Sequence, residues 1–107
     1  SRISFDALAE SGAMAEEMRA LLIWARNHGV TGAQMARFAL AAYNQGQGNL
    51  GKAMMLAGTQ GSDPTQWGTI PVYLAMVIDP KRTAECVNYV NQILAYWNTY
   101  EGVGEKV

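Results

Sequence analysis

Apolar residues recur at helical spacing along most of the chain. In the first quarter they fall near the i, i+3, i+4 and i+7 positions of one stripe, among residues that favour helix. This pattern predicts a long amphipathic helix from Ser4 or Asp6 to Asn27. The stripe consists of Leu8, Met14, Met18, Leu21, Leu22 and Ala25. Gly29 follows where a C-cap glycine is expected, and His28 beside it is expected to interact with the helix dipole.

Two further helices are predicted on either side of a glycine-containing turn. Thr31 is a suitable N-cap for a helix over residues 32–42, whose apolar face includes Phe38. After the turn "YNQGQG", Asn49 can cap a short helix over residues 50–57.

All three prolines fall within residues 58–80, together with several glycines. This composition predicts a long loop with short helical turns, one of them over residues 64–67. The segment "TIPVYLAMVI" is the best strand candidate, but Pro71 argues against it. We expect Trp67 to pin the loop to the core rather than to stack on a ligand.

A last helix is predicted from the residues around Thr83 to residues 101–102, followed by a frayed tail. Its buried stripe is expected to consist of Val87, Val90, Leu94 and Trp97, flanked by Cys86, Tyr89, Ile93, Tyr96 and Tyr100. We expect Cys86 to be a small core residue. The sequence therefore predicts a mainly α fold in which residues 1–107 form one compact helical domain.

Composition argues against several classes of partner. The chain has 8 basic and 9 acidic residues and a net charge of −1, so no strong positive field attracts nucleic acid. One cysteine and one histidine cannot make an internal disulfide or a structural zinc site, and we expect neither metal nor cofactor. Apolar runs fall short of the roughly 20 residues that span a bilayer, so we expect no transmembrane segment, and the N-terminal residues lack an export signal.

The segment "ALAAYNQGQGNL" carries the candidate chemistry. An alanine-rich run stops at Tyr43 and Asn44, and glycines follow at positions 46 and 48. The carboxamide of Asn44 can both donate and accept hydrogen bonds, and a glycine lets the backbone approach a ligand closely. Tyr43 can present its ring face to a ligand. In the structural alternative, Asn44 and Gly46 only cap the helix and Tyr43 packs in the core.

Three segments together resemble a known family. "LAAYNQGQGNLGKAM" resembles the Ala-Tyr-Asn-x-Gly-x-Gly segment of the goose-type lysozyme and soluble lytic transglycosylase superfamily. "AMMLAGTQGSDPTQWGTIPVYL" resembles the membrane-bound lytic murein transglycosylase branch, and "CVNYVNQILAYWNTY" resembles the last helix of that family. The resemblance runs in the correct order over residues 36–100. It implies a lysozyme-like helical domain, or its C-terminal portion, with a long loop that contains proline and glycine.

The resemblance also implies an activity on peptidoglycan glycan strands. In this family one glutamic acid protonates the β-1,4 bond between N-acetylmuramic acid and N-acetylglucosamine. It then acts as a base while the muramyl 6-hydroxyl attacks, which gives a 1,6-anhydromuramyl product. A tyrosine hydroxyl orients the acid, and this role falls to Tyr89. The implied substrate-binding residues are Tyr43, Asn44, Gln45, Gly46 and Gly48.

The position of the glutamic acid is the open point, because the family places a Glu-Ser pair and then a Gly-Leu-Met-Gln segment before the tyrosine motif. This chain has Glu10 and Ser11 but no such segment, and the interval to Tyr43 is much shorter. Either Glu10 is the catalytic acid and a hairpin has been deleted, or the chain begins downstream of the acid. We favour the second hypothesis, because "AEEMRALLIWAR" matches the family helix just before the motif.

Other assignments follow from the same resemblance. Location in the cell envelope or periplasm, or in a phage virion, is expected. A missing N-terminal portion would leave apolar surface exposed and favour self-association or association with that portion. The alternative function is a catalytically inactive, lysozyme-like component that binds glycan or has a structural role in a secretion or phage machine. Glu16, Glu17 and Glu85 are expected to be structural or solvated acids.

Overall fold

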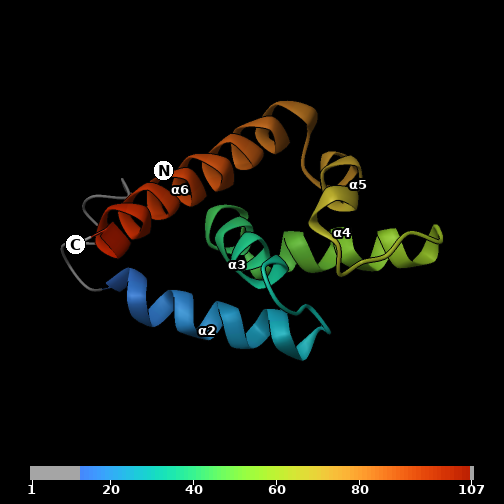
Figure 1. Cartoon of the computed structure of the whole chain (residues 1–107). Helices are drawn as coiled ribbons and strands as arrows, with labels where there is room; N and C mark the ends of the chain where they lie inside the picture. The colour runs from blue at the N-terminus through green and yellow to red at the C-terminus, as the bar shows by residue number, and fades with distance from the viewer. Residues whose placement is uncertain (1–12, 107) are drawn as a thin grey trace.

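The computed structural model describes residues 13–106, with side chains described over residues 15–98 (Figure 1). In this range the chain forms five α-helices and one short 3-10 helix, with no strand, which confirms the mainly α prediction. The elements are α2 (Ala13–Asn27), α3 (Gln34–Gln45), α4 (Gln47–Thr59), η1 (Trp67–Thr69), α5 (Ile70–Val77) and α6 (Pro80–Lys106).

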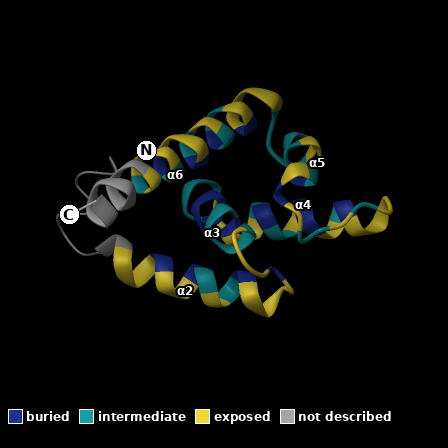
Figure 2. Cartoon of the chain, viewed as in Figure 1, coloured by how far each residue is buried: buried dark blue, intermediate teal, exposed yellow. Residues whose placement is uncertain are grey.

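Helix α3 lies at the centre of the fold, between α2 and α6 (Figure 1), and it also contacts α4 and η1. Five consecutive residues of α3 are buried, from Phe38 to Ala42 (Figure 2). A helix that is buried all round must be enclosed by other elements, and three alanines among these five residues let the neighbouring helices approach closely.

The helices around α3 bury one face each. In α2 the buried residues are Met18, Leu21 and Ala25, which belong to the predicted stripe. In α6 the buried face is formed by Thr83, Cys86, Val90 and Ile93. The predicted α6 stripe was therefore rotated too far, because Val87, Leu94 and Trp97 are only half-buried at its edge. Helix α6 packs against both α3 and α5.

Two predicted caps are wrong. Helix α3 has Ala33 at its N-cap, with no side-chain cap, so Thr31 does not start this helix. Asn49 lies inside α4, and its side chain donates to the carbonyl oxygen of Gln45 at 3.0 Å. Asn49 thus satisfies a carbonyl at the C-terminus of α3 instead of capping α4.

The long loop predicted over residues 58–80 is not formed. Only residues 60–66 connect α4 to η1, and the helical turn expected at 64–67 is shifted to Trp67–Thr69. Pro71 lies in the first turn of α5, where its missing N–H breaks no helical hydrogen bond. Helix α6 likewise begins at Pro80, and it runs past the predicted end at 101–102 to Lys106.

Trp67 fixes the connection to the central helix. Its backbone N–H donates to the side-chain oxygen of Gln34 at 2.8 Å, and its buried indole packs edge-on against Phe38, with ring centroids 5.9 Å apart. Trp67 is therefore part of the core, in agreement with the expected pinning role.

A turn at Asp63 shapes the connection before Trp67. The Asp63 carboxylate accepts hydrogen bonds from the Thr65 hydroxyl at 2.7 Å and from the Thr65 backbone N–H at 2.9 Å. These two bonds hold the pKa of Asp63 below its ordinary value of 3.8. The Asp63 carbonyl oxygen also accepts from the Thr69 hydroxyl at 2.7 Å, which joins the turn to η1.

Replacing Trp67 by Ala should lower the free energy of unfolding by about 3–5 kcal/mol, because the substitution leaves a cavity beside Phe38. Urea unfolding followed by circular dichroism measures the change. Val72→Ala is the control: Val72 is 61% exposed on α5, and its truncation should change stability by less than about 0.5 kcal/mol. Equal effects of the two substitutions would contradict the pinning role of Trp67.

Stability should depend on pH through Asp63. Because its pKa is lower in the folded chain, ionised Asp63 stabilises the fold above pH 3.8, and this contribution is lost as the pH falls through the folded pKa. Asp63→Asn keeps an oxygen acceptor but cannot titrate. The difference in unfolding midpoint between the two chains should therefore change below pH 3.8 and stay constant at neutral pH. A difference that is constant at every pH would refute the role of this carboxylate.

Candidate functional site

Gly46 is the one-residue junction between α3 and α4. Its backbone has φ 92° and ψ 146°, a conformation that residues with a Cβ rarely adopt. Its N–H donates to the Ala42 carbonyl at 2.6 Å, and its carbonyl accepts from the Leu50 N–H at 3.1 Å. Gly46 therefore ends one helix and starts the next, which places the residues of the tyrosine motif at a sharp change of chain direction.

The C-terminus of α3 is tied to α6 by side chains. The Arg82 guanidinium donates to the Gln45 side-chain oxygen at 2.9 Å, and the Gln45 side-chain nitrogen donates to the Asn44 side-chain oxygen at 2.7 Å. The Asn44 side-chain nitrogen is shielded from solvent and has no hydrogen-bond partner among the described residues. Tyr43, the residue before Asn44, is half-buried and packs against the core.

Tyr89 is half-buried at the edge of the polar face of α6, where it packs against the core and its hydroxyl is shielded from solvent. It lines a hollow of about 230 Å³ together with Glu85, Asn88 and Gln92. Arg82, Glu85 and Tyr89 follow the i, i+3, i+7 spacing, so they share one face of the helix, with Arg82 about 10 Å from Tyr89 along its axis. One side of α6 thus carries both the bond to the tyrosine motif and the polar hollow.

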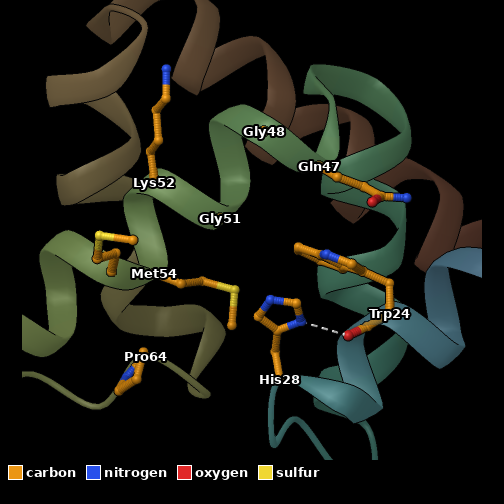
Figure 3. A pocket seen from close by; sticks show the side chains of 9 residues that line it. Trp24, His28, Gln47, Gly48, Gly51, Lys52, Met54 and Pro64 are labelled. Atoms are coloured by element: carbon orange, nitrogen blue, oxygen red, sulfur yellow. Dashed lines mark hydrogen bonds between the residues drawn. The ribbon is translucent and has the colours of Figure 1, made fainter.

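A second, larger hollow of about 460 Å³ lies between the end of α2 and the first turns of α4 (Figure 3). Trp24 and His28 come from the α2 side, and Gly48 and Met54 from α4. The side chains of Trp24, His28 and Met54 point toward one another, whereas Lys52 points away (Figure 3).

His28 has a fixed place in this larger hollow. Its ring lies over Trp24 with centroids 4.7 Å apart, and its Nδ1 is 2.8 Å from the Trp24 carbonyl oxygen. A carbonyl only accepts, so Nδ1 carries the proton and donates it. His28 therefore satisfies a carbonyl near the C-terminus of α2, in agreement with its expected place at the helix end.

The structure divides the predicted substrate-binding residues between two sides of α3. Gln45 bonds to Arg82 on α6 and Asn44 bonds to Gln45, whereas Gly48 lines the hollow beside α2. Gly46 separates the two groups. The predicted acid Glu10 lies outside the described residues.

Sequence reasoning missed Arg82 and Glu85 as members of the site. Glu85, which was expected to be a structural or solvated acid, lies inside α6 and lines a hollow together with Tyr89. Helical spacing from Tyr89 would have found both residues. The bond from Arg82 to Gln45 joins positions 37 residues apart, so no local pattern could have indicated it.

Among residues 15–98, whose side chains the structure describes, no cluster of three His, Cys, Asp or Glu side chains could hold a metal ion. No helix in this part of the chain is long and apolar enough to cross a membrane.

The chain is similar to curated lytic transglycosylases. It is 32% identical over 80 residues to membrane-bound lytic murein transglycosylase F of Shewanella frigidimarina (strain NCIMB 400), with 65% of this chain and 17% of that protein covered. It is 35% identical over 80 residues to the protein of the same name from Vibrio vulnificus (strain YJ016), with 64% and 15% covered. These findings confirm the resemblance to the membrane-bound lytic murein transglycosylase branch.

The extent of this similarity is limited. The chain spans less than a fifth of the length of these relatives. The similarity to the Shewanella protein covers 65% of this 107-residue chain. A continuous stretch of that length always contains the middle of the chain, and therefore residues 43–48. No family model matches the chain, and no solved structure matches it.

The two glycines of the motif should respond differently to Ala. Gly46→Ala should lower the free energy of unfolding by about 1–3 kcal/mol, because its φ is strained for any residue with a Cβ. Gly48 lies inside α4, and a Cβ added there would meet nothing within 4 Å, so Gly48→Ala should be neutral or stabilise by up to about 1 kcal/mol. Urea unfolding compares the two variants. Equal stability would show that Gly46 does not determine the junction.

Proposed function

We propose that this chain belongs to the peptidoglycan lytic transglycosylases and forms the C-terminal part of their catalytic domain. The observation that carries the proposal is the similarity to lytic murein transglycosylase F from two organisms, over a stretch that includes the tyrosine motif. The small share of those relatives that the chain covers is what a portion of a larger protein would give.

In this proposal the end of α3 and the polar face of α6 form one wall of a glycan-binding cleft. Asn44 and Gln45 supply carboxamides, which match the amide and hydroxyl groups of N-acetylated sugars. Gly46 leaves an exposed stretch of backbone without a side chain between α3 and α4. Tyr89 and the polar side chains around it extend this wall along α6.

The proposed reaction is cleavage of the β-1,4 bond between N-acetylmuramic acid and N-acetylglucosamine. One glutamic acid donates its proton to the glycosidic oxygen, and the bond to the anomeric carbon breaks. The same carboxylate then removes the proton of the muramyl 6-hydroxyl as that oxygen bonds to the anomeric carbon, which leaves a 1,6-anhydro ring. The Tyr89 hydroxyl orients the carboxyl group.

The acid itself comes from the chain before residue 13. It is either Glu10 or, as we favour, a residue that precedes Ser1 in the parent protein. The similarity to membrane-bound lytic murein transglycosylases supports a place in the cell envelope, where the glycan substrate lies.

A digest of purified peptidoglycan tests this proposal. The parent protein should release 1,6-anhydromuropeptides, identified by mass spectrometry, because its acid and this wall lie in one domain. The 107-residue chain should bind insoluble peptidoglycan and release no such product. Asn44→Ala should weaken that binding by about threefold to tenfold, which is the usual effect of losing one hydrogen bond.

Glu10→Gln decides the place of the acid. If the 107-residue chain does release anhydro products and Glu10→Gln abolishes them, Glu10 is the acid. Glu16→Gln serves as the control, because Glu16 is exposed on α2 and should leave binding and turnover unchanged. Absence of both turnover by the parent protein and binding by this chain would refute the proposed function.

A further inference from the structure

The side-chain bonds between α6 and the tyrosine motif have a fixed direction. The Arg82 guanidinium carries five N–H donors and no acceptor, so only the oxygen of Gln45 can face it. The nitrogen of the same carboxamide must then point away from Arg82. It does so, and it donates to the Asn44 oxygen at 2.7 Å.

The orientation of the Gln45 carboxamide in turn determines the orientation of the Asn44 carboxamide. A carboxamide has nearly the same shape when its oxygen and nitrogen exchange places, so packing alone does not decide its orientation. A nitrogen donor from Gln45 needs an oxygen opposite it. The oxygen of Asn44 is therefore used within the protein, and its nitrogen is the group that remains.

The remaining nitrogen is shielded from solvent and has no hydrogen-bond partner among the described residues. A buried donor without an acceptor destabilises the folded chain, so an oxygen atom brought to this position is favoured. Because the nitrogen is shielded, neighbouring side chains must shift before a ligand reaches it. The group that fits is an acceptor, such as the carbonyl of an acetamido group or a hydroxyl oxygen.

We propose that Arg82 is a positioning residue that makes Asn44 meet its ligand as a hydrogen-bond donor. The ligand class, an N-acetylated glycan, rests on the proposed function. The orientation of the two carboxamides rests only on the bonds between Arg82, Gln45 and Asn44. The two parts can be tested separately.

Arg82→Glu should reverse the direction. A carboxylate only accepts, so the Gln45 nitrogen should turn toward position 82, and its oxygen should accept from the Asn44 nitrogen. Arg82→Met removes the donor without adding an acceptor. Lys81→Glu is the matched control, because Lys81 is the exposed neighbour on α6 and undergoes the same change of charge.

Side-chain NH2 signals in ¹⁵N NMR spectra report the orientation without any ligand. In the unmodified chain the Gln45 NH2 should show the slower solvent exchange of a bonded group, with a cross-relaxation peak to Asn44. In Arg82→Glu the Asn44 signals should acquire the chemical shift of a donor bonded to Gln45. Lys81→Glu should leave both residues unchanged. Unchanged Asn44 and Gln45 signals in Arg82→Glu would overturn the positioning role.

Titration with a tetramer of N-acetylglucosamine tests recognition. Binding should shift the Asn44 NH2 signals, and it should weaken by about threefold to tenfold in Arg82→Met and by at least as much in Arg82→Glu. Lys81→Glu should bind about as well as the unmodified chain. Undiminished binding by an Arg82→Glu chain with reversed carboxamides would refute the donor role of Asn44. If the unmodified chain does not bind the tetramer, the glycan assignment fails, while a reversal of the signals would still establish the orientation by Arg82.

Discussion

The fold depends on the enclosure of α3. Because residues 38–42 are buried in succession, this helix needs neighbours on every side, and α2, α4, α6 and η1 supply them. The same enclosure fixes where α3 ends. At Gly46 the chain leaves the core through a conformation that glycine adopts without strain, and α4 begins at the next residue. The tyrosine motif is therefore held at the end of the most constrained helix among the described residues.

A motif in this position can combine structural and recognition roles. Tyr43 packs on the core and Gly46 sets the junction, as the structural alternative requires. The carboxamides of Asn44 and Gln45 do more than cap a helix, because they are joined to each other and to Arg82. Asn49 from α4 satisfies the Gln45 backbone carbonyl. The two interpretations of the motif therefore apply to different residues within it.

Local pattern predicted much of the fold. The glycine after α2, the apolar face of that helix and a break between two helices near Gly46 follow from spacing and capping chemistry. The predicted turn over residues 43–48 was too long, because α3 runs to Gln45 and α4 begins at Gln47. The predicted cap at Thr31 is wrong because α3 begins only after Ala33, and the predicted cap at Asn49 is wrong because its side chain donates to the Gln45 carbonyl oxygen, four residues before it. The proline-rich segment was misjudged because Pro71 and Pro80 stand in first turns of helices, where proline is tolerated. For the site, the motif indicated the end of α3, but the bond from Arg82 to Gln45 depends on the packing of α6, which no local pattern contains.

The central claim is that glycan binds where the end of α3 meets the polar face of α6. The most direct measurement is a map of backbone amide shifts in the 107-residue chain as purified, uncross-linked peptidoglycan strands are added. We expect the largest shifts at residues 43–46 and 82–92. Shifts confined to the hollow at Trp24 and His28, or spread evenly over the helices, would contradict the claim.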